Sequence, residues 1–140
     1  MGIGEIKVID IVDKNDKIIG QIKDSKMHGG NFITRGVGVF VINNKKEIYL
    51  QKRSEHKYRY PLHWDFSAGG IVDSGKTYKE SIIDELKEEI GIHVKEDEVL
   101  LLEKTFVDND IKEFQSRFKI YFNGEINKHN WEVKEGTWKK

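Results

Sequence analysis

The sequence predicts one domain of the α+β class, an α/β/α-type sandwich in which a mixed β-sheet carries a helix on one face. Two observations support this prediction. Segments rich in β-branched and aromatic residues lie on both sides of a single helical segment, and this order is typical of a mixed sheet. The chain has 140 residues, which is enough to bury a core in one domain that spans 1–140.

The expected strands before the helix begin with an N-terminal β-hairpin. Two β-prone segments lie on either side of Asp13-Lys14-Asn15-Asp16, a stretch rich in turn-forming residues. The longest apolar stretch, Val37–Ile42, is interrupted only by Gly38 and suits a buried central strand. Strands are expected at Glu5–Val12, Lys17–Lys23, Ile33–Ile42, Glu47–Arg53 and Trp64–Ser67, with a connector at Ser25–Asn31 and a loop at Ser54–His63.

The helical segment is defined by apolar residues that recur with a period of about 3.6 residues. It follows a glycine-containing turn that runs from Gly69 and Gly70 to Gly75. The helix is expected to end at Gly91, because glycine is favoured just after a helix. Its apolar stripe consists of Tyr78, Ile82, Ile83, Leu86 and Ile90.

After the helix, strands are expected at Val99–Val107, Phe114–Asn123 and Trp131–Val133. Trp64 lies inside a strand-like segment and is expected in the core. The sequence contains no second long amphipathic helix, so one face of the sheet has no evident cover. The N-terminal hairpin, a second copy of the chain in a homodimer, and a further C-terminal segment are the alternatives.

The composition excludes several classes of function. Lys and Arg together number 24, as do Asp and Glu, and the zero net charge argues against a general nucleic-acid or membrane-surface partner. The absence of cysteine removes disulfides, thiolate metal sites and a cysteine nucleophile. No apolar run has the length of a membrane span, and the N-terminus lacks a signal core. A cytoplasmic location is therefore expected.

Three glutamates, Glu85, Glu88 and Glu89, lie within about one turn of the predicted helix. Glu88 points away from the apolar stripe, whereas Glu85 and Glu89 lie on its flank. Carboxylates that are partly buried cost free energy unless a positive group lies opposite them. Hard oxygen ligands without a thiol favour Mg²⁺, with Mn²⁺ as a substitute. A solvated helix face is the alternative interpretation.

The segment Gly70–Ile92 resembles the Nudix box. The pattern of that family is Gly, five residues, Glu, seven residues, Arg-Glu, an aliphatic, any residue, Glu-Glu, any residue, Gly and an aliphatic. The flanking Leu50–Ser54, Trp64-Asp65 and Ser67–Gly70 resemble the branch that is similar to isopentenyl-diphosphate isomerase, as does the stretch from Ile9 to Gly20. Seven of nine specified positions match: Gly70, Glu85, Leu86, Glu88, Glu89, Gly91 and Ile92.

The resemblance implies a Nudix fold and Mg²⁺-dependent hydrolysis of a diphosphate linkage in a small molecule of the nucleoside diphosphate-X type. It assigns catalytic and metal-binding roles to Glu85, Glu88 and Glu89, and metal binding to the backbone carbonyl of Gly69. Glu113, one acid among many, is a candidate for the extra carboxylate that some members use from a later loop. Substrate contacts are expected at Arg53, Lys57 and Gly70.

Two positions depart from the family pattern. Lys76 replaces the glutamate, and Asp84 replaces the arginine, so the two charges are exchanged. One hypothesis is that Lys76 and Asp84 form a reversed structural pair. The alternative is that loss of the arginine leaves a slow or silent protein that binds a nucleotide or partner without turnover. The isomerase activity of the related branch is not expected, because Gly69 stands where a cysteine is needed.

Overall fold

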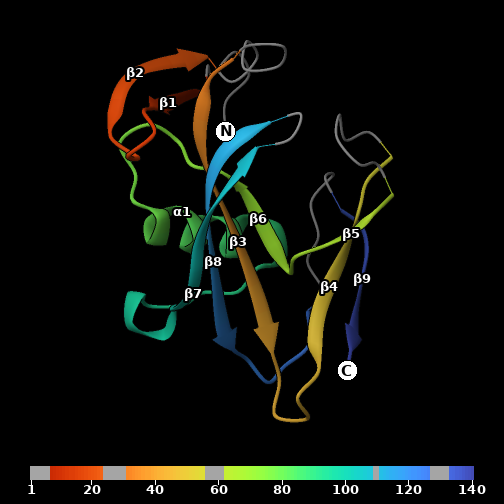
Figure 1. Ribbon diagram of the computed structural model, residues 1–140. Helices are drawn as coiled ribbons and strands as arrows, with labels where there is room; N and C mark the ends of the chain where they lie inside the picture. Colours follow the sequence, from red (N-terminus) through yellow and green to blue (C-terminus); the bar gives the residue numbers. More distant parts are fainter. Residues whose placement is uncertain (1–6, 24–30, 56–61, 109–110, 127–132) are drawn as a thin grey trace.

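The computed structural model describes residues 7–23, 31–55, 62–108, 111–126 and 133–140. In this part of the chain, strands precede and follow one α-helix along the sequence, as predicted (Figure 1). The strands are β1 (Val8–Val12), β2 (Ile18–Lys23), β3 (Ile33–Ile42), β4 (Ile48–Arg53), β5 (Trp64–Asp65), β6 (Ala68–Ile71), β7 (Leu100–Asp108), β8 (Lys112–Tyr121) and β9 (Val133–Lys139). The helical elements are α1 (Tyr78–Glu85), η2 (Leu86–Ile90) and η3 (Glu96–Glu98).

Strand β3 is the centre of the mixed sheet. It runs parallel to β8 along its whole length, from Ile33 opposite Lys112 to Ile42 opposite Tyr121, and antiparallel to β6. The hairpin of β1 and β2 joins β3 through the pairing of Val12 with Ile33, and β7 pairs with β8. Strand β4 pairs with β3 only near their connecting turn, and then continues with β5 and β9.

Ser67 stabilises the point where β3 and β4 separate. Its hydroxyl accepts a hydrogen bond from the backbone N–H of Val41 at 2.8 Å and donates to the carbonyl of Tyr49. The side chain of Gln51 donates to the Ser67 carbonyl. Strand β6 therefore begins between β3 and β4, where these two strands separate. One edge of β6 pairs with β3, and the other edge faces away from β3.

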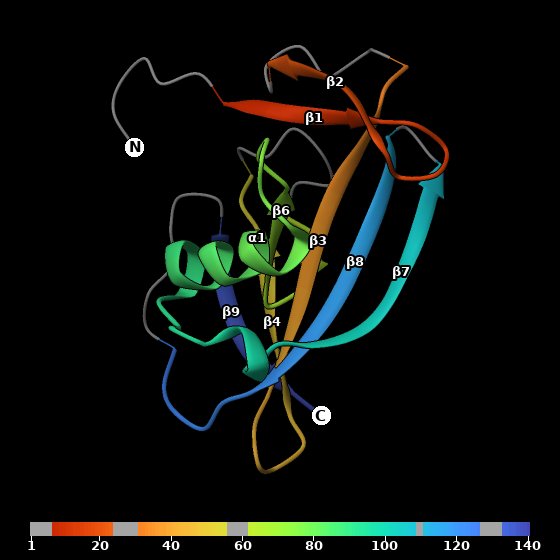
Figure 2. The same cartoon turned by 90° about the vertical axis from the view of Figure 1, so that its left-hand side faces the viewer.

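Helix α1 packs on one face of the sheet (Figure 2). It begins at a capping box, in which Thr77 and Glu80 satisfy each other's backbone N–H groups. Ile82 and Leu86 are fully buried against the valines of β3. The last turn, η2, is a π-helix that ends at Gly91, whose positive φ of 72° suits glycine. No second long helix occurs among the described residues.

The structure corrects three expectations. Gly69 and Gly70 do not form a turn but lie within β6, because a close backbone approach to β3 requires a residue without Cβ; a Cβ on Gly69 would lie 2.7 Å from the Val37 carbonyl oxygen. Trp64 is 44% exposed rather than in the core, since it lies on the outer side of β5 near the ammonium groups of Lys52 and Lys139.

The third correction concerns the last strand. The segment Trp131–Val133 was expected to be short, but β9 runs on from Val133 to Lys139. Trp131 lies outside the described residues. The extension is explained by the pairing of β9 with β4 and by Trp138, whose ring packs edge-on against the buried Tyr49 at 5.3 Å.

Candidate functional site

Two glutamates of the helix lie against the glycine backbone of β6. The Glu85 carboxylate occupies the space beside Gly70: a Cβ added there would be 2.8 Å from one carboxylate oxygen. The Glu89 side chain is 5% exposed and accepts a hydrogen bond from the Gly69 backbone N–H at 3.3 Å. These two carboxylates therefore face adjacent residues of one strand, as expected for neighbours on one flank of the helix.

The backbone of Gly69 points its polar groups away from β3. Val72 donates its N–H to the Arg35 carbonyl of β3, and the direction alternates along an antiparallel strand. The Gly69 N–H accordingly faces the outer edge of β6, where Glu89 accepts it. Because the N–H and C=O of one strand residue point to the same side, the Gly69 carbonyl oxygen faces this edge too.

The third glutamate differs from this pair in its exposure to solvent. Glu88 is exposed on the π-helical turn, as the predicted helix face required. Within the described residues, no group of three His, Asp or Glu side chains is gathered closely enough to hold a metal ion. The structure thus brings Glu85 and Glu89 to the glycine strand and leaves Glu88 exposed.

Lys76 and Asp84 form an ion pair in the structure. The hydrogen bond that Lys76 donates to the Asp84 carboxylate raises the pKa of Lys76 above its ordinary value, against a smaller opposing effect of burial. The two exchanged charges of the box therefore contact each other and join the loop before α1 to the last turn of that helix. This contact supports the interpretation of the exchange as a reversed structural pair.

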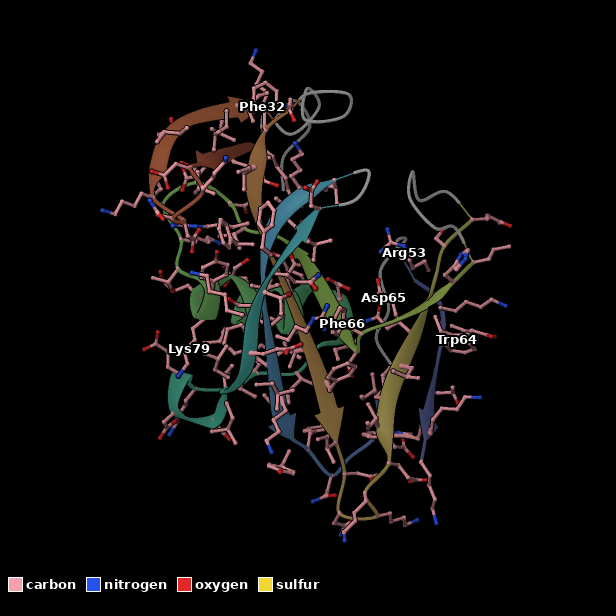
Figure 3. All side chains as sticks on the ribbon, in the orientation of Figure 1. Phe32, Arg53, Trp64, Asp65, Phe66 and Lys79 are labelled. Atoms are coloured by element: carbon pink, nitrogen blue, oxygen red, sulfur yellow. The ribbon has the colours of Figure 1, made fainter. Side chains whose placement is uncertain are left out.

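The predicted substrate-binding residues lie in different parts of the chain, and the structure describes two of the three. Arg53, at the end of β4, pairs with Asp65 of β5 at 2.9 Å (Figure 3). Gly70 lies in β6 beside Glu85, whereas Lys57 lies outside the described residues. Glu113 of β8 lies over Gly36 of β3, where a Cβ would be 2.9 Å from its carboxylate oxygens.

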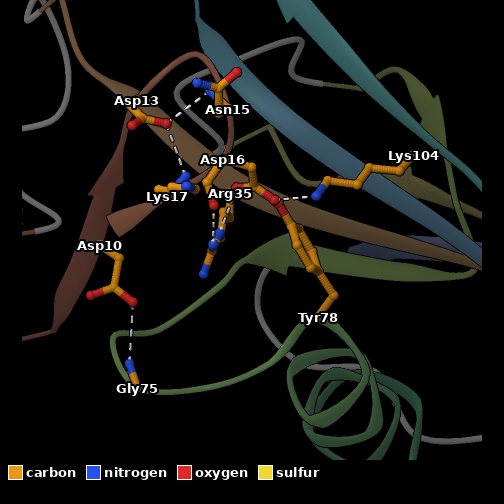
Figure 4. Close-up of polar contacts among 9 residues, drawn as sticks. All are labelled: Asp10, Asp13, Asn15, Asp16, Lys17, Arg35, Gly75, Tyr78 and Lys104. Carbon is orange, nitrogen blue, oxygen red and sulfur yellow. Dashed lines mark hydrogen bonds and ion pairs between the residues drawn. The ribbon is translucent and has the colours of Figure 1, made fainter. Parts of the chain in front are cut away.

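The sequence interpretation missed two carboxylates of the N-terminal hairpin. Asp10 accepts a hydrogen bond from the Ser74 hydroxyl at 2.7 Å. It also accepts one from the Gly75 N–H at 3.3 Å (Figure 4). Asp16 accepts hydrogen bonds from Arg35 at 2.7 Å, from the Tyr78 hydroxyl at 2.8 Å, and from Lys104. Only their positions in the hairpin, Asp10 in the first strand and Asp16 in the turn, could have drawn attention to them, because their partners are remote in sequence.

A sequence model of the NUDIX domain matches residues 33–138 of this chain. The chain therefore belongs to the Nudix family, and the fold expected from the box is confirmed. The β1–β2 hairpin lies outside the matched residues.

Curated relatives agree with this assignment. A protein named an uncharacterized Nudix hydrolase, from Nostoc sp., is 37% identical over 89 residues, which are 63% of this chain and 53% of the relative. Isopentenyl-diphosphate Delta-isomerase 1 of Photorhabdus laumondii is 30% identical over 88 residues, 62% of this chain and 50% of the relative. The chain thus spans about half the length of these relatives.

A crystal structure of a Deinococcus radiodurans protein is similar over 95% of this chain and 83% of that chain, with a TM-score of 0.79 and 22% identity. This likeness concerns the fold and includes nearly all of the chain. Among the described residues, no helix has the length and apolar character needed to cross a membrane.

Proposed function

We propose that this Nudix domain is a Mg²⁺-dependent hydrolase that cleaves a diphosphate linkage in a small molecule of the nucleoside diphosphate-X type. The observation that carries the proposal is the placement of Glu85 and Glu89 against the Gly69–Gly70 backbone. Mn²⁺ is the expected substitute for Mg²⁺. A cytoplasmic location and a homodimer remain predictions from the sequence.

The residues around β6 fit a hard divalent cation. Glu85 and Glu89 supply carboxylate oxygens, and the Gly69 carbonyl faces the same edge. The absence of a side chain at Gly70 leaves the space that the Glu85 carboxylate occupies. Glu85, Glu89 and the Gly69 carbonyl would hold the ion, and Glu88, exposed on the adjoining turn, would complete the set or act on water.

Each part of the site has a separate chemical task. Bound Mg²⁺ would neutralise charge on the diphosphate and lower the pKa of a bound water. Glu88 would accept the proton of the attacking water, since an exposed carboxylate on this turn can approach it. Arg53 would contact a phosphate and would either keep or break its ion pair with Asp65. Its planar guanidinium can bind both a carboxylate and a phosphate. Lys57 stays a predicted phosphate contact.

A phosphate-release assay with Mg²⁺ tests the proposal. The substrates are nucleoside diphosphate sugars, dinucleoside polyphosphates, NADH and nucleoside triphosphates. Glu89→Gln should lower turnover by about 100-fold or more, the scale of losing a metal ligand or a general base. Glu96→Gln, which changes an exposed carboxylate outside the site, should leave turnover unchanged. Turnover that survives Glu89→Gln intact would contradict the assigned site.

The exchange of Lys76 and Asp84 favours one second candidate, a Nudix domain that binds a nucleotide or partner without turnover. Its signature is tight nucleotide binding with no product from any substrate of the panel. The isomerase relative makes a further control necessary. We expect no conversion of isopentenyl to dimethylallyl diphosphate, because the sequence has no cysteine and glycine occupies position 69.

A further inference from the structure

The loop that leads into α1 is bound by the N-terminal hairpin. Asp73 forms a β-bridge with Ile9, and Ser74 donates its backbone N–H to the Val8 carbonyl at 2.8 Å. The Ser74 hydroxyl accepts a hydrogen bond from the Gln21 side chain at 2.7 Å and donates to Asp10. Three consecutive loop residues, 73–75, thus contact the hairpin, directly before the helix that carries the site glutamates.

Asp10 has the central place in this contact. Its side chain is only 3% exposed, and a buried carboxylate is costly unless donors satisfy its oxygens. One oxygen accepts from the Ser74 hydroxyl and the other from the Gly75 N–H, so both are committed to the loop. Gly75 has a φ of 86°, a conformation that favours glycine and that the Asp10 contact holds in place.

A second contact continues from the loop to the helix itself. Tyr78 is the first residue of α1, and its hydroxyl donates to Asp16 at the turn of the hairpin. Asp16 also accepts from Arg35 of β3 and Lys104 of β7. The start of the helix is therefore tied, through one carboxylate, to two strands of the sheet.

We propose that Asp10 is a positioning residue for the carboxylates of Glu85 in α1 and Glu89 in η2. Gly75 is followed at once by Lys76, which pairs with Asp84, and by the cap residue Thr77. A displaced loop would therefore shift the helix along its axis and move Glu85 and Glu89 relative to the Gly69–Gly70 backbone. Asp10 belongs to the β1–β2 hairpin, which lies outside residues 33–138, the part of the chain that the family model matches.

The inference rests on the proposed metal site, and Mn²⁺ affinity measured by electron paramagnetic resonance tests it without turnover. Asp10→Ala should weaken Mn²⁺ binding by about 10-fold or more, the scale of removing an outer-shell partner. Asp10→Asn, which keeps one acceptor, should lose less. Asp13→Asn is the matched control, because the Asp13 side chain accepts from the N–H groups of Asn15 and Lys17 within the hairpin, and this variant should bind Mn²⁺ as the wild type does.

Thermal unfolding of each variant separates positioning from folding. A folded Asp10→Ala protein with unchanged Mn²⁺ affinity would overturn the proposal, even if its Tm fell. If Asp10→Ala does not fold, Ser74→Ala deletes one donor to Asp10 and should weaken Mn²⁺ binding in the same direction; unchanged affinity there would equally overturn it. A wild type that binds no Mn²⁺ overturns both proposals, whereas Mn²⁺ binding that depends on Asp10 without turnover contradicts the hydrolase alone.

Discussion

Lys76 and Asp84 show how one pair of residues can depart from a family pattern and keep its geometry. Their side chains are 39% and 36% exposed, so solvent screens the attraction between them. The pair is expected to contribute little to global stability and to act locally, by joining the loop before α1 to the last turn of that helix.

A double-mutant cycle tests this pair. Lys76→Glu and Asp84→Arg singly place like charges together, whereas the double variant restores an attraction with the family's order of charges. The coupling free energy from urea unfolding should be about 0.2–1 kcal/mol in favour of the double variant, as for other exposed pairs. Strictly additive losses would show that the contact has no energetic role.

Asp16 makes stability depend on pH. Burial alone would raise its pKa, but hydrogen bonds from Lys104, Arg35 and Tyr78 outweigh burial and lower the pKa below its ordinary value. A carboxylate with a lowered folded-state pKa stabilises the fold above its unfolded pKa, and this contribution is lost as the pH falls through the folded-state value.

Comparison of wild type with Asp16→Asn tests this dependence. The free energy of unfolding of the wild type should exceed that of the variant at neutral pH, and the difference should shrink below about pH 4. Urea titrations at pH 7, 5 and 3 measure it. A difference that is constant over this range would mean that the charge of Asp16 does not contribute.

At the scale of elements, the contact of β6 with α1 and η2 defines the site. Gly70→Ala would place a Cβ 2.8 Å from the Glu85 carboxylate, and the flexible end of that side chain would move away. Mn²⁺ affinity should therefore fall by about 10-fold, while thermal stability changes little. Gly20→Ala is the control, since nothing lies within 4 Å of its Cβ position. Equal affinity in the two variants would contradict the placement of Glu85.

Periodicity predicted most elements because each has a local signal. The helix stripe, the hairpin turn and the central strand were all confirmed, and so was the outward direction of Glu88. The β-structure of Gly69 and Gly70 was not predictable, because it depends on pairing with β3, which is remote in the chain. The same limit applies to Asp10 and Asp16, whose roles come from contacts across 19 to 88 positions.

At the scale of the whole molecule, the strands form two groups that meet where β3 pairs with β4 near their connecting turn. In the first group β3 pairs with β1, β6 and β8, and in the second group β4 pairs with β5 and β9. The second group depends on β9, which the sequence predicted too short, and on close packing at Gly136. A Cβ there would lie 1.9 Å from the Tyr49 hydroxyl oxygen, and Tyr49 is buried. The close contact between β4 and β9 therefore needs glycine at this position.

Gly136→Ala should lower the free energy of unfolding by about 1–3 kcal/mol, the usual cost of overpacking. Urea unfolding measures the loss. Since β6 and the helix lie in the other group of strands, Mn²⁺ affinity of the folded variant should stay at the wild-type value. Stability equal to wild type would contradict the close packing of Tyr49 against β9.

A crystal structure with Mg²⁺ and a non-hydrolysable nucleoside diphosphate analogue at neutral pH would test the metal site most directly. We expect one ion held by the Glu85 and Glu89 carboxylates and the Gly69 carbonyl oxygen, in contact with the diphosphate. An analogue bound elsewhere, or both glutamate side chains turned to solvent with no ion between them and β6, would contradict the proposed function.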